Sequence, residues 1–518
     1  MNCDRISSRR GIFVVAVYAI AFLSVAPAGG AAFAQGKAPV DYQVSFDNAV
    51  HHEARIRATF RDIGDAPLVL FMSRSSPGRY SLHEFARNVY SVEAVDGAGR
   101  KLAITRDDPY SWRIAGHDGT VAVSYTLYGD RADGTYSQID LTHAHLSMPA
   151  TFMWAKGFDD RPITVTFAPP DRRWKVATQL APTRGRMTFT APNLQYFMDS
   201  PTELSNFLMR EWQVGSGDSR QTIRLAIHHE GEDKDVDIFA AKIQKIVAEE
   251  MKIFGGAPHY DYGVYTFIAD YLPYASGDGM EHRDSTTLTS AHSLYENDFS
   301  QIDSVAHEFF HSWDSERMRA TGIEPFDFTR TNSTPSMWFA EGFTNYYGPL
   351  AMLRAGESTI DEFLYGVGGE LGATINSQGR RQGSPMAMSM LAPLTDRPVS
   401  NYPDNFANSF ISYYTYGEVI ALGLDLTLRS QFHGLTLDDY MRHMWKAHSD
   451  TNAPYTPDDL RNGLAETTGD AAFAKDFFAR YIEGNDLPDF EPLLAQAGLA
   501  LVSKNENAAS VGRISFEE

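Results

Sequence analysis

Cysteine is almost absent from this sequence. Among 518 residues there is one, Cys3, close to the N-terminus. A single cysteine excludes a disulfide within the chain, and a chain processed beyond that point would contain no thiol. Thiolate metal sites and cysteine nucleophiles are then excluded as well. A metal ion in this protein would have to be bound by histidine, aspartate or glutamate.

Long hydrophobic runs are equally scarce. The longest, "GIFVVAVYAIAFLSVAP", follows Arg5, Arg9 and Arg10 and precedes the small residues "AFA". This order of basic, apolar and small residues is typical of a cleavable signal peptide, although a membrane anchor is the alternative. We expect residues 1–34 to be removed and the mature protein to be exported, periplasmic or secreted, without stable membrane insertion. The paired arginines leave Sec and twin-arginine export open, because Ile12 stands where the latter signal usually has Phe.

Positive charge is in deficit. The chain has 45 Lys and Arg against 66 Asp and Glu, a formal net charge of −21. Nucleic acid is therefore not an expected partner. An acidic protein suits a substrate with a cationic group, although acidity more often serves solubility. The hydrophobic content of 43% indicates a globular protein with a substantial core. The sequence does not indicate an oligomeric state.

Hydrophobic patterning predicts an α+β protein with several domains. Segments such as "YQVSF", "EARIRATF" and "TVAVSYTLYG" alternate apolar and polar residues, so residues 35–230 are expected to form an antiparallel β-sandwich-like domain. Residues 231–350 mix helical and strand patterns. From 351 to 518 the signals are mostly helical, with a capping box at Thr359 and Glu362. The proline-rich stretch 376–410 is predicted to be a long loop.

The segment "VAHEFFHSWD" contains the pattern HExxH. In a helix, residues four apart project from the same face, so His307 and His311 can direct both imidazoles at one metal ion. Glu308 sits one step round the helix, where its carboxylate can reach a water beside the metal. This is the arrangement of zinc hydrolases, but the pattern is short and also arises by chance on buried helices.

A third ligand is available downstream. A catalytic zinc needs three protein ligands and an open position. Glu341 lies in "MWFAEGFTNYY", and a second helix packed beside the first could bring its carboxylate to the metal. Asn345, one turn later, could orient a ligand histidine. A surface position for Glu341 is the alternative, but its aromatic neighbours argue for burial, and a buried carboxylate needs a partner.

Together these segments resemble the glycyl aminopeptidase family, which comprises zinc exopeptidases of the gluzincin type related to aminopeptidase N. Besides "HEFFHSW" and "WFAEGFTNYY", the segment "GDGMEHRDS" is similar to the family's Gly-Gly-Leu-Glu-His-type motif. "YYTYG" is similar to its Tyr-x-Lys-Gly segment, and "SRSSPGRY" and "DLTHAHL" resemble its β domain. The resemblance spans most of residues 40–500 and implies that 231–350 is a thermolysin-like zinc catalytic domain.

The resemblance also implies roles for individual residues. One zinc ion per chain would be bound by His307, His311 and Glu341. Glu308 would be the general base and Tyr414 would stabilise the oxyanion. The segment "GME", which is Gly279, Met280 and Glu281, would bind the substrate. Within it, Glu281 would pair with the α-ammonium of a peptide. The family's preference is for small N-terminal residues, Gly and Ala, on peptides with a free N-terminus.

The sequence departs from the family pattern at two positions. Tyr416 stands where the family usually has Lys, and Asp314 where it usually has Asn. Neither departure removes a ligand or the base, but the first changes a neighbour of Tyr414. Many relatives continue into a C-terminal PDZ domain, and the residues after "LLAQAGLALV" are too few for one, so none is expected.

Other readings stay open. A zinc endopeptidase would use the same ligands, and a non-catalytic peptide-binding protein could retain the zinc for structure. Glu281 could be an ordinary edge-strand residue. His143 and His145 would share one face of a strand, which allows a second metal, although spaced histidines in sheets are usually only hydrogen-bonded. His228 and His229 are adjacent and are predicted to lie at the surface.

Overall fold

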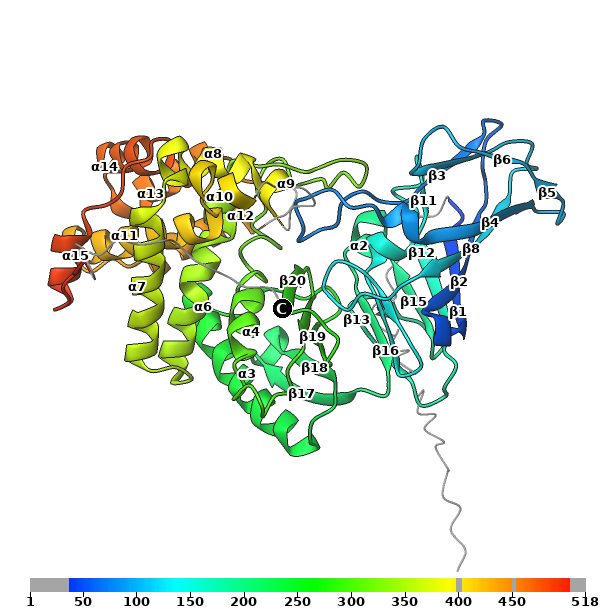
Figure 1. Cartoon of the computed structure of the whole chain (residues 1–518), viewed down its shortest axis with the longest axis horizontal. Coiled ribbons are helices and arrows are strands. Elements are labelled where there is room, and N and C mark those ends of the chain that lie inside the picture. The colour runs from blue at the N-terminus through cyan, green and yellow to red at the C-terminus, as the bar shows by residue number, and fades with distance from the viewer. Residues whose placement is uncertain (1–36, 397–402, 450–452, 504–518) are drawn as a thin grey trace, which may run out of the picture. The chain divides into compact units, whose positions relative to one another are not determined.

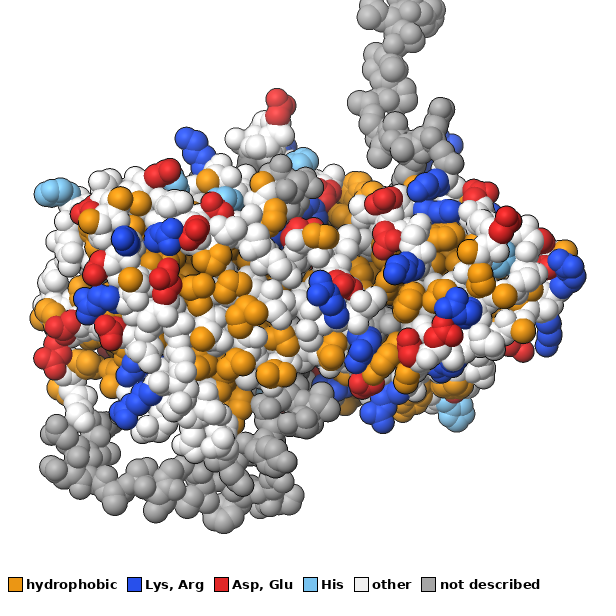
Figure 2. Space-filling model, turned by 90° about the horizontal axis from the view of Figure 1, so that it is seen from above, with side chains coloured by type: hydrophobic (Ala, Val, Ile, Leu, Met, Phe, Trp, Pro, Cys, Tyr) orange, Lys and Arg blue, Asp and Glu red, His pale blue; other side chains and the backbone are white. Residues whose placement is uncertain are grey.

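The computed structural model describes residues 37–396, 403–449 and 453–503, and the residues from Lys37 onward belong to one compact unit (Figure 1). The predicted signal peptide, residues 1–34, lies outside the described residues, as does Pro398 of the predicted loop. Among the described residues, no helix is both long enough and apolar enough to cross a membrane. Acidic and basic side chains are interspersed on the face shown in Figure 2.

The N-terminal region is built on an eight-stranded sheet with the order β14-β15-β12-β1-β2-β8-β4-β5. The alternating segments of the sequence form its strands, because every second side chain enters the core: Val40, Tyr42, Val44 and Phe46 of β1 are all buried. The sheet is antiparallel except for the parallel pair β1 and β12. Its strands are β1 (Val40–Asn48), β2 (Glu53–Phe60), β4 (Val89–Asp96), β5 (Lys101–Leu102), β8 (Val121–Tyr128), β12 (Ile163–Ala168), β14 (Ala181–Pro182) and β15 (Thr188–Ala191).

Two four-stranded sheets and two short helices complete this region. The sheet orders are β13-β16-β10-β9 and β11-β3-β7-β6, and neighbouring strands in both sheets are antiparallel. The elements are β3 (Leu68–Phe71), β6 (Ile104–Thr105), β7 (Ser111–Ile114), β9 (Gln138–Ile139), β10 (His143–Leu146), β11 (Trp154–Ala155), β13 (Lys175–Thr178), β16 (Thr202–Ser205), α1 (Met148–Thr151) and α2 (Leu194–Met198).

A five-stranded mixed sheet follows, with the order β17-β18-β19-β21-β20. Its strands are β17 (Leu208–Val214), β18 (Gln221–His229), β19 (Val264–Tyr271), β20 (Asp278–His282) and β21 (Ser285–Ser290). Strands β18 and β19 are parallel and are joined through helix α3 (Asp233–Phe254). This sheet therefore spans the predicted domain boundary at residue 230, since β17 and β18 precede it and β19 follows it. The division into domains stays a prediction.

Helices make up most of the rest of the described chain: α4 (Ile302–Phe310), α5 (Met337–Ala340), α6 (Gly342–Ala355), α7 (Ile360–Asn376), α8 (Pro385–Met390), α9 (Ala392–Thr395), α10 (Pro403–Ser409), α11 (Tyr413–Gln431), α12 (Leu437–His448), α13 (Pro457–Thr468), α14 (Ala471–Phe477) and α15 (Phe490–Gln496). The predicted capping box at Thr359 and Glu362 is present at the start of α7. The prediction of one long loop over 376–410 is wrong, because α8, α9 and α10 occupy much of it: their prolines stand at or next to helix starts, where a proline is tolerated.

Two glycines let α11 come close to the α5–α6 segment. A Cβ added at Gly342 would collide with the backbone of Gly417, and one added at Gly417 would collide with the carbonyl oxygen of Trp338. Backbone can meet backbone here only because neither residue has a side chain. The close packing fixes the N-terminal end of α11, and with it Tyr414, against the helices that carry the predicted metal ligands.

Candidate metal centre and active site

The two histidines of "HEFFH" converge as their spacing predicts. Helix α4 ends at Phe310, and His311 directly after it keeps helical backbone angles, with φ −61° and ψ −15°. The two side chains therefore lie on one face, and their Nε2 atoms are 3.1 Å apart. His311 is fully buried, whereas the side chain of His307 keeps 20% of its exposure. The pair thus stands at the edge of the core, open on the side of His307.

Glu341 meets both imidazoles. It lies between α5 and α6, and its Oε2 is 3.4 Å from His307 Nε2 and 3.3 Å from His311 Nε2. This oxygen is buried and has no hydrogen-bond partner. Burial alone would raise the pKa of Glu341, but His311 and His307 outweigh it and hold the pKa below its ordinary value. The structure therefore brings together the three residues predicted to bind the metal.

The spacing of these donor atoms suits a tetrahedral ion. Ligands about 2.0–2.2 Å from a zinc ion lie roughly 3.3–3.6 Å from one another. The three donor atoms here are 3.1–3.4 Å apart. Two neutral imidazoles and one carboxylate are also the donor set of many catalytic zinc sites, and the unpartnered Oε2 is explained if it faces a cation. The residues present therefore fit zinc.

Other residues hold these side chains in place. His311 donates from Nδ1 to the backbone carbonyl of Asp314, 2.8 Å away, which leaves Nε2 free to face the metal position. Tyr80 donates its hydroxyl proton to Oε1 of Glu341. The pKa of His307 is lowered, chiefly by burial, while the nearby Glu341 carboxylate acts in the opposite direction. Asn345 lines the same cavity as His307, and its role in orienting that histidine stays a prediction.

Tyr80 was not among the predicted site residues. It belongs to "SRSSPGRY", whose family resemblance was the only sequence signal pointing to it. The contact of His311 with residue 314 uses a backbone carbonyl, so the departure from Asn to Asp there leaves it intact. Burial raises the pKa of the Asp314 side chain well above its usual range, with His311 opposing that shift.

Glu308 faces the edge strand β20. Its carboxyl group is buried, and burial raises its pKa well above the ordinary value, assisted by the nearby carboxylates of Glu281 and Glu341 and opposed by His311. Any Cβ at Gly279 would collide with Oε1 of Glu308. Gly279 therefore brings bare backbone against the predicted general base.

Glu281 shares this buried pocket. One carboxylate oxygen of Glu281 lies within 4.8 Å of donor atoms of both Glu308 and His311. Burial raises the pKa of Glu281 to about 7, with His311 opposing that shift. Of the described lysines and arginines, none forms an ion pair with it. Met280 beside it is fully buried, and its carbonyl oxygen accepts a hydrogen bond of 2.8 Å from Thr286.

Tyr414 lies at the start of α11, next to the histidines. Its ring centroid is 6.1 Å from that of His307, and it stacks on Tyr413. Burial, with Glu341 nearby, raises its pKa well above 10, so its hydroxyl keeps its proton at neutral pH. Tyr416 does not share this position: its side chain is fully buried, and the charged groups that influence its pKa are Arg380 and Asp486. Tyr416 follows Tyr414 by two positions on the same helix, so the two side chains project from different faces of α11.

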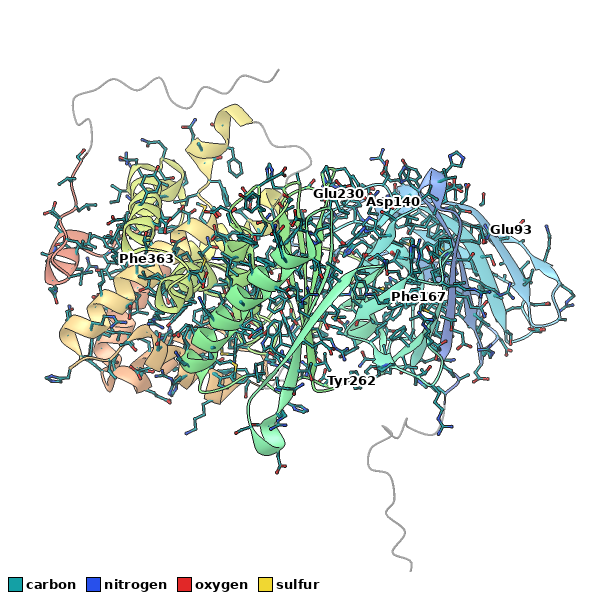
Figure 3. The ribbon with its side chains drawn as sticks, turned by 90° about the horizontal axis from the view of Figure 1, so that it is seen from below. Glu93, Asp140, Phe167, Glu230, Tyr262 and Phe363 are labelled. Atoms are coloured by element: carbon teal, nitrogen blue, oxygen red, sulfur yellow. The ribbon has the colours of Figure 1, made fainter. Side chains whose placement is uncertain are left out.

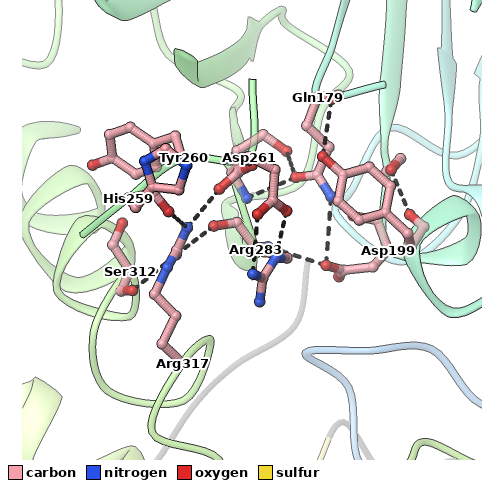
Figure 4. Close-up of polar contacts among 12 residues, drawn as sticks. Gln179, Asp199, His259, Tyr260, Asp261, Arg283, Ser312 and Arg317 are labelled. Carbon is pink, nitrogen blue, oxygen red and sulfur yellow. Dashed lines mark hydrogen bonds and ion pairs between the residues drawn. The ribbon is translucent and has the colours of Figure 1, made fainter. Parts of the chain in front are cut away.

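A polar network fixes β20 and β21 relative to the segment after α4 (Figure 4). Arg317 donates to Asp284 at 2.6 Å and to the carbonyl oxygens of Ser312 and Arg283 at 3.0 and 2.7 Å. Gln179 accepts hydrogen bonds of 2.9 Å from the backbone N–H of Asp284 and from Ser285. The strand that carries Glu281 is thus tied to the turn that follows His311.

A cavity of about 620 Å³ opens beside His307 and Asn345. It is lined by residues of α4, α6 and α7, among them Phe363, which Figure 3 labels. Its charged lining is mainly acidic and includes Glu357, Glu362 and Glu418. The cavity borders the exposed side of His307, and its volume is within the usual range of ligand pockets.

Comparisons with known proteins place the chain in a family. The model of the peptidase M61 N-terminal domain matches residues 41–206, and that of the M61 glycyl aminopeptidase matches 300–420. Together the two cover more than half of the chain. The comparison with curated proteins found no match.

Solved structures show the same fold. An aminopeptidase N family protein from Idiomarina loihiensis is similar with a TM-score of 0.78 and 24% identity, over 88% of this chain and 78% of that one. A variant of an M1 zinc metallopeptidase from Deinococcus radiodurans, bound to a Tyr-Ser-Ala substrate, has a TM-score of 0.51 and 13% identity over 87% and 94%. The family matches show that the chain belongs to the M61 glycyl aminopeptidase family and is a metallopeptidase of the aminopeptidase type.

Proposed function

We propose that this enzyme is an aminopeptidase with a single catalytic zinc ion that releases small N-terminal residues, Gly and Ala, from peptides. The observation that carries the proposal is the position of Glu281. This buried carboxylate has no lysine or arginine partner among the described residues and lies within 4.8 Å of donor atoms of Glu308 and His311. A peptide α-ammonium is the cation that would satisfy it, one residue away from the reacting carbonyl.

His307, His311 and Glu341 would hold the zinc ion, with one ion at this site. When bound, zinc supplies Lewis acidity toward the scissile carbonyl and lowers the pKa of water to about 7. Tyr80 and the carbonyl of Asp314 keep the carboxylate and the imidazole of His311 in position. These contacts preserve the ligand geometry without taking part in the reaction.

Glu308 is the general base in this proposal. Its raised pKa suits a group that takes a proton from water on its carboxylate oxygen and later delivers the proton to the leaving amine. Tyr414 keeps its phenolic proton and donates a hydrogen bond to the oxygen on which negative charge develops. Neither role requires a large movement, because both side chains already border the histidine pair.

We further propose that the peptide extends from Glu281 past His307 into the acidic cavity. The Tyr-Ser-Ala ligand of the Deinococcus radiodurans structure supports binding of a short peptide on this fold. The order of residues in 1–34 supports export to the periplasm or the exterior. A mature N-terminus close to residue 35, found by sequencing the protein recovered from the host envelope, would support export, and an intact N-terminus would argue against it.

The test of the function uses matched substrates. Purified enzyme is assayed on Gly-, Ala- and Leu-anilides and on their N-acetylated forms, before and after zinc is removed by a chelator and restored. We expect turnover of the free Gly and Ala substrates, none of the acetylated ones, and recovery with zinc. Equal cleavage of free and acetylated substrates, or cleavage within a blocked peptide, would instead identify an endopeptidase. Binding without turnover would identify a non-catalytic protein.

A further inference from the structure

A second group of histidines and carboxylates lies between two sheets. His143 on β10 and Glu203 on β16 belong to the sheet β13-β16-β10-β9, while His228 on β18 and Asp270 on β19 belong to the five-stranded sheet. One donor atom from each of the four lies within 4.8 Å of the others. Figure 3 labels Asp140 and Glu230, which stand close in sequence to His143 and His228. We call these four residues the intersheet cluster.

The cluster is buried and its donor atoms lack hydrogen bonds. His143 and Glu203 are fully buried and Asp270 is 1% exposed. Neither Nδ1 of His143 or His228 nor any carboxylate oxygen of Glu203 and Asp270 has a hydrogen-bond partner. Buried polar atoms are normally paired, so this many unpaired atoms facing one another call for a ligand between them. The prediction that His228 lies at the surface is correct only in part: 18% of its side chain is exposed, while its ring packs 4.7 Å from that of His143.

Charge points to a cation. Glu203 and Asp270 bring two negative charges into the interior, and no described lysine or arginine forms an ion pair with either. The cationic groups within ion-pair distance of these two carboxylates are the imidazoles of His143, His145 and His228, which carry charge only when protonated. Buried carboxylates that face neutral imidazoles are strongly unfavourable. A divalent ion would balance the two carboxylates while leaving the histidines neutral, which is the form in which they bind metals.

The distances between the donor atoms of the cluster are more typical of ligands around a metal ion than of charge-assisted hydrogen bonds. His143 Nδ1 is 3.5 Å from Glu203 Oε1 and 3.7 Å from Asp270 Oδ1, and His228 Nδ1 is 3.9 Å from that same oxygen. Charge-assisted N–H···O bonds are about 2.7–2.9 Å long. Ligands that share a tetrahedral ion at about 2.0–2.2 Å are roughly 3.3–3.6 Å apart, which is much closer to the observed spacing.

The surroundings resemble those of a bound metal. Nε2 of His143, on the far side of its ring, lies 3.6 Å from Asp140 Oδ2 and 3.5 Å from the hydroxyl oxygen of Tyr274. Tyr274 in turn donates to Asp140 at 2.7 Å. His145 Nδ1 is 3.0 Å from the other oxygen of Asp270, although the two atoms do not meet in hydrogen-bond geometry. Outer carboxylates that orient a ligand imidazole are a regular feature of metal sites.

We propose that His143, Glu203, His228 and Asp270 bind a second divalent transition-metal ion of the zinc type, which joins the four-stranded sheet to the five-stranded sheet. Four protein ligands complete a tetrahedral shell, so this ion has a structural role and leaves no position for substrate. The expected content is therefore two ions per chain, one more than the family resemblance implies. The same strand β19 packs against β13, so the ion would reinforce an existing contact between the sheets.

The test is the metal content of purified protein, measured by elemental analysis together with the melting temperature. Wild type is expected to contain two equivalents of metal. Glu203→Gln, which keeps the size of the side chain, should retain one equivalent and melt at a lower temperature, and Glu341→Gln should retain one equivalent at the intersheet cluster. His51→Gln, at an exposed histidine, is the matched control and should keep both.

Two results would overturn the proposal. One is a wild type with a single equivalent that is lost entirely in Glu341→Gln, which would make the intersheet cluster a network of protonated histidines and carboxylates. The other is unchanged metal content in a folded Glu203→Gln protein. If Glu203→Gln does not fold, the content of wild type and of Glu341→Gln still decides the question, because neither of these proteins alters the intersheet cluster.

Discussion

Two histidine–carboxylate groups in one chain differ in what surrounds them. The first, His307, His311 and Glu341, offers three donor atoms 3.1–3.4 Å apart at the ends of helices, and a cavity reaches His307. The intersheet cluster offers four donors from four strands of two sheets. Three ligands leave a coordination position open for chemistry, and four close the shell.

The residues around each group support the same division into a catalytic and a structural site. Around the first stand groups able to move a proton or hold a charge, namely Glu308, Tyr414 and Glu281, each with a pKa raised by burial. Around the intersheet cluster stand Asp140, Tyr274 and His145, which contact its members. The same residue types therefore support catalysis at one place and, in our proposal, cohesion between sheets at the other.

The largest expected effect comes from exchanging one buried glutamate for glutamine in each group. Glu308→Gln should lower kcat on Gly- and Ala-anilides by about 10²–10⁴-fold, the usual contribution of a general base, without changing the melting temperature much. Glu203→Gln should do the reverse, lowering the melting temperature and leaving kcat of the folded protein nearly unchanged. Wild-type turnover by Glu308→Gln would contradict a catalytic role for the first group.

A smaller effect is expected at the amine-binding position. Glu281→Gln removes the charge that would pair with the α-ammonium, and losing one partner of a buried charge pair costs about 2–5 kcal/mol, so kcat/KM for free N-termini should fall at least ~30-fold. Glu93→Gln, at an exposed glutamate, is the control and should be neutral. Equal losses on free and acetylated substrates would show that Glu281 acts on the reaction in general and does not recognise the amine.

Tyr80→Phe tests a residue that contacts the metal ligand Glu341 and does not itself bind the metal. The substitution removes the hydrogen bond to Glu341 Oε1, and such outer contacts typically change metal affinity or activity about 10–100-fold. Zinc affinity is measured by titration with a competing chelator. Tyr42→Phe, which removes another buried tyrosine hydroxyl bonded to a carbonyl oxygen, should affect stability alone. If both variants bind zinc as tightly as wild type, Tyr80 does not position Glu341.

The smallest effect is expected at Tyr416. Its hydroxyl is buried without a hydrogen-bond partner, and its side chain projects from a different face of α11 than that of Tyr414, so Tyr416→Phe should leave kcat/KM within about 2-fold. Tyr414→Phe, two residues earlier, is the paired comparison and should lower kcat through loss of the oxyanion hydrogen bond. A large loss from Tyr416→Phe would mean that the departure from the family's Lys matters for the reaction.

Local patterns predicted the parts of the molecule that depend on neighbours in sequence. The alternation in β1, the capping box at Thr359 and the helical spacing of His307 and His311 need only a few residues each. Glu341 was found through its aromatic context and the family resemblance. Each of these features depends only on residues close together in the sequence, so a short segment is enough to predict it.

What the sequence did not show depends on pairing between distant strands. Tyr80 reaches Glu341 across 261 residues, and the parallel pair of β1 and β12 is set by topology. Of the intersheet cluster, the sequence pattern indicated a possible metal ligand only at His143, which shares a strand face with His145, and His228 was predicted to lie at the surface. Glu203, His228 and Asp270 come from three further strands, and no short pattern records that two sheets will bring them together.

The central claim is that His307, His311 and Glu341 converge on one metal ion in the working enzyme. Anomalous scattering at the zinc absorption edge, recorded from crystals of active protein, tests it directly. The account predicts a strong peak about 2 Å from Nε2 of both histidines and from a Glu341 carboxylate oxygen. A map of active enzyme with no peak at that position would contradict it.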